Sequence, residues 1–292
     1  MRQGRTPSGG SNDMDANRKE LMVFLGLLLG LTAISYVPIC LLHIPHAENS
    51  LYALGFVFSP CVAAISTRLI YQGNLRDLGW RWGRTKYAAI SYFLPVAYGV
   101  AVYGLVCLLR LGALNHEYVN QFILVKRAWL DFLVFATFGV LVRGIAAFGE
   151  EIGFRGFLVP QLAKMTSFTK MCLISGSIWA LWHFPIVMLT DYGRKDALSL
   201  ICMTISLISA SFIFAWLRLR SGSVWTAVIF HASHNRYIQD LFDNLVSDTG
   251  YTKRIVGEFG IGLAVVLPLV AFICCRWSPR EFRTEASCQL ES

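Results

Sequence analysis

Residues 198–217 read LSLICMTISLISASFIFAWL, a run of 20 residues without a charged side chain. The hydrocarbon core of a bilayer is about 30 Å thick, so a helix needs about 20 apolar residues to cross it. This run therefore predicts one membrane-spanning helix. A water-soluble core has no room for many runs of this kind, so the question is whether the pattern recurs.

Similar runs recur on both sides of this stretch. The 292-residue chain is 55% hydrophobic and only 15% charged, against about 25% charged in soluble domains, and its mean hydropathy is +0.53. We predict an all-α integral membrane protein of about eight transmembrane helices. They are expected at residues 21–42, 51–71, 87–109, 130–148, 171–189, 198–217, 224–241 and 255–275.

The basic charge of the chain is explained by this topology. Lys and Arg number 26 against 18 Asp and Glu, which gives a formal net charge of +8. In the eight-span arrangement 15 of the basic residues fall on the side of the two termini and 7 on the other side. Cytoplasmic loops carry the excess of Lys and Arg, so both termini are expected in the cytoplasm, with the plasma (inner) membrane as the location. No stretch combines clustered basic residues with exposed aromatics, so nucleic acid is not an expected partner.

The remaining organisation is simple. We expect a disordered cytoplasmic tail at 1–20, a transmembrane domain at 21–275 and a second cytoplasmic tail at 276–292. The eight cysteines lie almost entirely inside apolar runs and form no CxxC pair, which indicates packing residues and no disulfide framework. Gly26 and Gly30 form a GxxxG, a pattern typical of close helix packing.

Three predicted helices carry ionisable or polar groups, which are costly at membrane depth. In the first, residues 148–155 read FGEEIGFR. Glu151 and Arg155 are four apart on a helix and are expected to form an ion pair. Glu150 points about 100° away and has no partner nearby in the sequence. It is therefore the carboxylate available as a general base.

The second helix contributes a histidine within an apolar run, SIWALWHFP at 177–185. Trp179 lies one turn before His183 on the same face. A single buried histidine is normally a packing residue. His183 therefore indicates a functional site only in combination with the other two helices.

The third helix reads FHASHNR at 230–236. His231 and Asn235 are four apart and share a face, which His234 partly shares. Taken together, the three helices supply a carboxylate base, histidines and an amide donor. These are the groups needed to activate a water molecule and to stabilise an oxyanion.

The three motifs resemble those of the CPBP family of membrane proteases, which includes the type II CAAX prenyl endopeptidases and bacterial abortive-infection and bacteriocin-immunity relatives. The family motif EExxxR stands at 150–155 and HxxxN at 231–235. The family usually shows FxxxH as its second motif, whereas here Trp179 precedes His183. The resemblance covers about residues 130–241.

The resemblance implies an endopeptidase that acts on membrane-associated peptides or proteins, including prenylated CAAX-type substrates, in the lipid bilayer. Its active-site residues are expected to converge in a cavity reached from the cytoplasmic side. Carried over by position, Glu150 and His183 activate the attacking water, and His231 and Asn235 stabilise the oxyanion. The implied supporting residues are Glu151, Arg155, Trp179 and His234, although His234 is equally compatible with packing.

Metal dependence stays open at this point. Members of the family are commonly labelled metalloproteases, and Glu150, His183 and His231 have the side chains of a three-ligand zinc set with an open fourth position. The HExxH signature of zinc proteases is absent from the sequence. We expect hydrolysis that depends on glutamate without an obligatory metal.

Two alternatives from other classes remain. The first is a non-catalytic scaffold or immunity protein on the same fold, in which the site is kept without proteolysis. The second is a proton-coupled transporter, because intramembrane Glu and His residues also build proton relays. The sequence shows no inverted repeat with paired broken helices, which disfavours the transporter.

Overall fold

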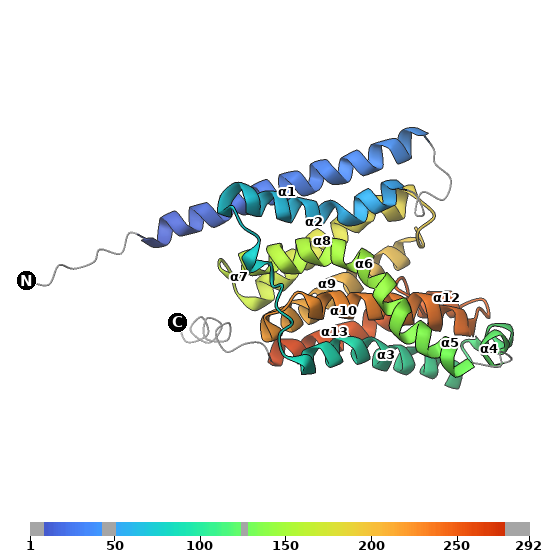
Figure 1. Ribbon diagram of the computed structural model, residues 1–292. Helices are drawn as coiled ribbons and strands as arrows, with labels where there is room; N and C mark the ends of the chain where they lie inside the picture. Colours follow the sequence, from blue (N-terminus) through green and yellow to red (C-terminus); the bar gives the residue numbers. More distant parts are fainter. Residues whose placement is uncertain (1–8, 43–50, 124–127, 278–292) are drawn as a thin grey trace, which may run out of the picture.

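The computed structural model describes residues 9–42, 51–123 and 128–277, and this part of the chain is almost entirely helical (Figure 1). The 3₁₀ and π segments are labelled η, and the two short strands pair antiparallel, Ala113 with Ser247 and Leu114 with Val246. The elements in chain order are α1 (Gly9–Leu42), α2 (Leu51–Gln72), η2 (Arg76–Leu78), α3 (Thr85–Leu108), β1 (Ala113–Leu114), α4 (His116–Ile123), α5 (Ala128–Val134), η3 (Phe135–Gly139), α6 (Val140–Glu151), η4 (Ile152–Leu158), α7 (Val159–Ala163), α8 (Phe168–Leu189), α9 (Ala197–Ser221), α10 (Trp225–His234), η5 (Asn235–Phe242), α11 (Asp243–Leu245), β2 (Val246–Ser247), α12 (Thr252–Ile255) and α13 (Ile261–Arg276).

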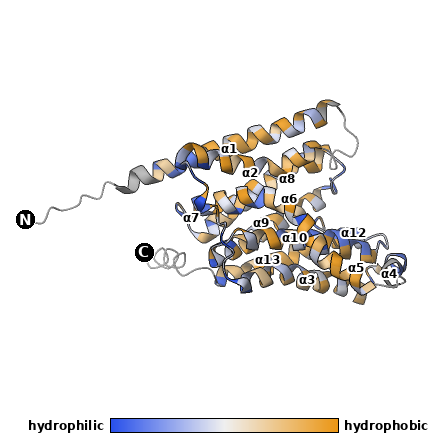
Figure 2. Ribbon diagram, in the orientation of Figure 1, coloured by the Kyte–Doolittle hydropathy of each residue, from blue (hydrophilic) through white to orange (hydrophobic). Residues whose placement is uncertain are grey.

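The long helices run side by side, with α1 on the outside of the bundle against α2 (Figure 1). Hydrophobic residues extend along their lengths, and hydrophilic ones gather toward the two ends of the bundle (Figure 2). Six helices in the described residues are long and apolar enough to cross a membrane: Met14–Ile39, Leu51–Gln72, Thr85–Leu108, Ala128–Ala163, Phe168–Leu189 and Ala197–Ser221. The prediction of an all-α integral membrane protein is confirmed.

The predicted count of about eight spans stays a prediction. The expected span at 224–241 corresponds to α10 continued by η5, which carries two histidines, an arginine and an aspartate. The expected span at 255–275 corresponds to α13, a helix of only 16 residues. Both lie in the bundle beside the longer helices (Figure 1).

The start of α1 differs from the sequence prediction. α1 begins at Gly9, so the helix starts inside the stretch 1–20 for which a disordered tail is predicted. The reason lies at Glu20, which is buried and accepts hydrogen bonds from Gln72 at 2.6 Å and Gln161 at 2.5 Å, so this polar stretch is tied to α2 and α7. Residues 1–8 and all but the beginning of the 276–292 tail lie outside the described part of the chain.

The fourth span is longer than predicted. It continues from Ala128 to Ala163, through α5, η3, α6, η4 and α7, and does not end at residue 148. The apolar run stops at 148 because acidic residues follow it, but the helix continues because those residues find partners inside the bundle. The π segment η4 starts directly after Glu151, and the π segment η5 starts at Asn235. Such segments often occur at functional sites.

Two glycines in the fourth span allow it to pack closely against α2. A Cβ at Gly153 would lie 2.3 Å from the Cβ of Pro60, and one at Gly149 would lie 2.8 Å from a backbone oxygen of α2. By contrast, a Cβ at Gly26 or Gly30 would have no atom within 4 Å among the described residues, so the close packing predicted there is wrong. The GxxxG that makes a close contact is Gly149–Gly153, which brackets the two glutamates.

Candidate active site

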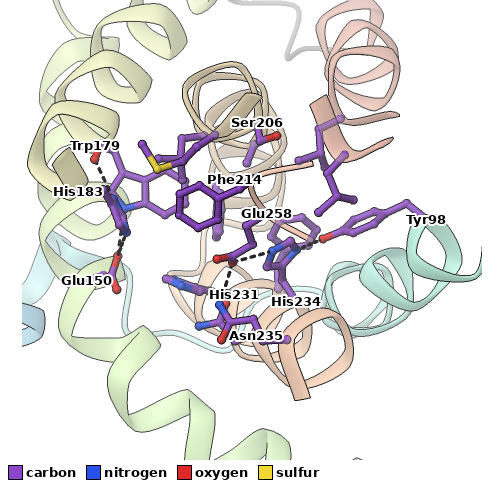
Figure 3. A pocket seen from close by; sticks show the side chains of 18 of the residues that line it. Tyr98, Glu150, Trp179, His183, Ser206, Phe214, His231, His234, Asn235 and Glu258 are labelled. Carbon is purple, nitrogen blue, oxygen red and sulfur yellow. Dashed lines mark hydrogen bonds and ion pairs between the residues drawn. The ribbon is translucent and has the colours of Figure 1, made fainter. Parts of the chain in front are cut away.

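One cavity, with about 720 Å³ of empty space, brings the predicted site residues together. They come from helices far apart in the sequence: α6, α8, and the junction of α10 with η5 (Figure 3). The predicted residues that line the cavity are Glu150, Trp179, His183, His231, His234 and Asn235.

Glu150 and His183 face each other across a short gap. Glu150 Oε2 accepts a hydrogen bond from Trp179 Nε1 at 3.0 Å and lies 4.0 Å from His183 Nε2. His183 Nδ1 lies 2.9 Å from the backbone oxygen of Trp179. That oxygen can only accept, so Nδ1 carries the proton, and in the neutral ring Nε2 is an acceptor. Trp179 therefore fixes both partners, one through its indole and the other through its carbonyl.

The distance between Glu150 and His183 suits a bridging water. Two acceptors 4.0 Å apart are too far for a direct hydrogen bond, whereas one water about 2.8 Å from each can donate a hydrogen to both. Both side chains are largely buried, which keeps bulk water from competing with this arrangement. The geometry can thus hold one water with its oxygen polarised for attack.

Glu151 lies on the other side of the helix, where it orients His231. Its Oε1 lies 2.9 Å from His231 Nδ1 and accepts a hydrogen bond from Arg155 Nη1 at 3.0 Å. Glu151 and Arg155 are 0% and 1% exposed, so this is a buried ion pair. Because Nδ1 is used by Glu151, Nε2 of His231 is the nitrogen left for the cavity.

Aromatic rings enclose Arg155. Its guanidinium carbon lies 4.2 Å from the centre of the Trp179 ring and 3.9 Å from that of Phe214. Cation–π contacts and the Glu151 carboxylate together offset the cost of burying this cation. Arg155 thus contacts both the residue that orients His231 and the residue that holds Glu150.

Asn235 lies one turn after His231 and lines the same cavity (Figure 3). Among the described residues its side-chain amide has no hydrogen-bond partner, so its N–H groups are available to a ligand. Asn235 and His231 therefore offer two groups to one region of the cavity, as their spacing predicts.

Sequence reasoning missed a second carboxylate in the cavity. Glu258, just before α13, accepts hydrogen bonds from Gln239 Nε2 at 2.8 Å and Tyr192 Oη at 2.9 Å, and its Oε1 lies 3.1 Å from His234 Nε2. The other ring nitrogen of His234 is hydrogen-bonded to Tyr98. The signal was present in the sequence, because Glu258 is an acidic residue inside a segment predicted to span the membrane.

A metal ion needs several ligand side chains that converge on one point. In the described part of the chain, no group of three or more His, Cys, Asp or Glu side chains is arranged to hold a metal ion. Glu150, His183 and His231 share the cavity, and Nδ1 of each histidine is held, by a backbone oxygen and by Glu151 respectively, as is usual for metal-ligating histidines. These histidine contacts fit a mechanism with zinc or without it, so hydrolysis without an obligatory metal stays a prediction.

The rest of the cavity wall is apolar. Seven of the apolar side chains that line it come from α9, α10 and α13: Met203, Leu207, Ala210, Phe214, Phe230, Leu263 and Leu267. Concave sites with apolar walls and a few convergent polar groups are typical of ligand sites. The polar groups thus lie at the edge of a surface suited to aliphatic or aromatic groups.

Fold and site together define an integral membrane protein with a buried cavity of carboxylate, imidazole and amide groups. Residues 129–237 match the family described as Type II CAAX prenyl endopeptidase Rce1-like. A curated relative is the protein named CAAX prenyl protease 2 of Methanococcus maripaludis, 28% identical over 141 residues. That match covers 44% of this chain and 47% of the archaeal protein, so less than half of either is aligned. This segment contains all three motifs, so both matches agree with the resemblance to the CPBP family that the motifs indicate.

Proposed function

We propose that the protein is an intramembrane endopeptidase that hydrolyses peptide bonds of membrane-associated proteins or peptides, with prenylated CAAX-type C-termini as the first substrate class. The observation that carries this proposal is the pair of acceptors, Glu150 Oε2 and His183 Nε2, 4.0 Å apart in the cavity. The CAAX protease named among its relatives supports the choice of substrate class.

The proposed reaction uses the chain's own side chains. Glu150 takes a proton from the bridging water as the water oxygen bonds to the scissile carbonyl carbon. The carbonyl oxygen becomes an oxyanion, which accepts hydrogen bonds from Asn235 and, when its ring is protonated, from His231. Glu150 then gives its proton to the amide nitrogen as the C–N bond breaks. The products are a carboxylic acid, which keeps the second hydrogen of the water, and an amine; transfer of that proton to the amine gives a carboxylate and an ammonium group.

Substitution of Glu150, the proposed general base, is the decisive test of the proposed function. Purified full-length protein in lipid nanodiscs is given quenched fluorescent peptides, prenylated CAAX peptides included, and the Glu150→Gln variant is compared with wild type. We expect wild-type cleavage and a loss of at least about 10²-fold in kcat in the variant. The matched control Glu117→Gln removes an exposed carboxylate on α4 and should cleave like wild type.

Treatment with a chelator distinguishes hydrolysis without a metal from hydrolysis that requires zinc. We expect cleavage to persist after chelation, because the water is placed by Glu150 and His183. Loss on chelation with recovery on adding zinc would contradict this mechanism while leaving a protease. Absence of cleavage of every peptide by wild type would contradict the protease itself and favour the scaffold alternative.

A further inference from the structure

Glu258 forms no ion pair with a Lys or Arg side chain in the described residues. Its donors are Tyr192, Gln239 and His234, and His234 is charged only if protonated. Because His234 binds a hydroxyl through its second nitrogen, a neutral ring satisfies both contacts. The arginines Arg143 and Arg236 both bind Asp240 instead.

The Glu258 carboxylate also has an unused acceptor position. A carboxylate accepts about four hydrogen bonds, two on each oxygen. Oε1 receives Gln239 and His234, whereas Oε2 receives only Tyr192. The side chain is 23% exposed and lines the cavity, so the remaining position is open to a ligand.

A second buried group in this cavity lacks a partner. Ser206 on α9 is 6% exposed and its hydroxyl has no hydrogen-bond partner among the described residues. It lines the same cavity as Glu258 (Figure 3). Buried polar groups are normally satisfied, so two incomplete groups in one cavity indicate that a polar ligand completes them.

The charge of the cavity wall determines what kind of ligand fits. Among the described residues that line it, the side chains of fixed charge are Glu150 and Glu258, both acidic, and none is Lys or Arg. In such a low-dielectric site an acidic ligand is repelled and a cation is attracted. Glu150 is engaged with Trp179 and the reacting water, which leaves Glu258 for the cation.

We infer that Glu258 forms a cation-binding subsite of the active-site cavity, which takes an ammonium or guanidinium group of the peptide substrate. The inference rests on the proposed function. The cation has two sources: a basic side chain near the scissile bond, or the amine released when the bond is cut. Either binds the free position on Oε2 by a charge-assisted hydrogen bond.

Peptides that differ at one position test the first source. Lys, norleucine or Glu is placed in turn at each of two residues on either side of the scissile bond, and kcat/KM is measured. At one position we expect wild type to prefer Lys over Glu by about tenfold or more. Glu258→Gln should bring that ratio close to one, whereas the control Asp243→Asn, a carboxylate outside the cavity, should keep it.

Inhibition by products tests the second source without any variant. A peptide with a free amino terminus should inhibit wild type about tenfold more strongly than its N-acetylated form. This arm stays decisive if Glu258→Gln fails to fold. The subsite is overturned if wild type shows neither preference, or if a folded Glu258→Gln keeps both.

Binding to an inactive variant separates this inference from the proposed function. Labelled Lys, norleucine and Glu peptides are titrated into Glu150→Gln and followed by fluorescence anisotropy. A preference for Lys here supports the subsite even if wild type cleaves nothing. Equal affinities for all three peptides overturn the subsite even if wild-type cleavage establishes the protease.

Discussion

Glu150 and Glu151 are neighbours in the sequence but have different surroundings. Glu151 is fully buried and shared between Arg155 and His231, whereas Glu150 faces the cavity with one indole donor. The separation of roles follows from helix geometry, since adjacent side chains point about 100° apart. At this scale the sequence predicts the Glu151–Arg155 pair and the free Glu150 well.

Other contacts at the residue scale could not be predicted. The hydrogen bonds of Glu258 join residues 192, 234, 239 and 258, and nothing local places these residues together. Helix periodicity reports which side chains share a face, but not which helices are neighbours. The three motifs were found because each is compact, whereas this second cluster is spread over the chain.

Trp179 gives a prediction at this scale, because the family usually has Phe at its position. Trp179→Phe keeps an aromatic ring against Arg155 and the backbone oxygen that holds His183, but loses the indole donor to Glu150. A hydrogen bond to a charged group is worth about 1.5–3 kcal/mol, so we expect kcat on a cleaved peptide to fall by roughly tenfold or more.

The control for this prediction lies on the same helix. Trp182 packs edge-on against His183 as Trp179 does, but it donates to Thr32 and makes no hydrogen bond to Glu150. Trp182→Phe should therefore leave kcat near the wild-type value. Equal losses of kcat in the two variants would show that aromatic packing, and not the indole donor, is what matters at Trp179.

Arg155 gives a prediction for stability. Arg155→Met leaves Glu151 buried without its cation, which is expected to lower the free energy of unfolding by about 3–5 kcal/mol. Adding Glu151→Gln removes the unpaired charge and should restore a large part of that loss. Denaturant unfolding in mixed detergent micelles measures both variants.

An exposed arginine serves as the comparison. Arg194→Met breaks the pair between Arg194 and Asp196 at the surface and should change the free energy of unfolding little, because exposed pairs contribute little. If Arg155→Met were as mild as Arg194→Met, the buried pair would have no structural role.

At the scale of elements, the site depends on how closely the helix of Glu150 approaches α2. Gly149 and Gly153 allow that approach, and the first sits directly before the two glutamates. The sequence pattern predicts close packing at Gly26 and Gly30 instead, because a GxxxG pattern does not reveal whether another helix lies against it. Only the packed structure distinguishes the two patterns.

Alanine at each pattern tests this difference. Gly153→Ala places a Cβ 2.3 Å from that of Pro60 and 2.6 Å from the Pro60 backbone, which cannot move aside as a flexible side chain would. We expect the free energy of unfolding to fall by about 1–3 kcal/mol. Gly26→Ala meets open space and should leave stability unchanged or raise it by up to about 1 kcal/mol. A larger loss at Gly26 than at Gly153 would contradict the packing described.

At the scale of the whole molecule, apolar runs predict the membrane class and most helices, but they end where polar residues begin. The fourth span was predicted to stop at residue 148 and continues to Ala163, because hydropathy cannot register that Glu151 and Arg155 neutralise each other. The α10–η5 helix is also polar, because it carries His231, His234 and Asn235, which line the cavity. Hydropathy therefore predicts span length least well in the helices that carry the candidate active site.

The two ends of the bundle differ in charge. Where α1 begins and α9 ends, basic side chains gather in the connecting loops and helix ends, namely Arg76, Arg81, Arg84, Lys164, Arg218 and Arg220. The cavity extends toward the opposite end, since its wall includes Tyr192 and Glu258 from the loops after α8 and before α13 (Figure 1). The cavity wall therefore reaches toward the face opposite the end where α1 begins, so the side from which the cavity is reached depends on the orientation of the chain in the membrane.

The excess of Lys and Arg favours the cytoplasmic location of the end where α1 begins. We expect Arg84→Cys, in a cysteine-free background, to react with a membrane-impermeant maleimide only from the cytoplasmic face, and Lys195→Cys only from the opposite face. Both positions are exposed, whereas Ser91→Cys on α3 is buried and should stay unlabelled. The reverse pattern would place the cavity on the cytoplasmic side, where proteins lipidated after synthesis arrive, and would show that charge does not set the orientation of this chain.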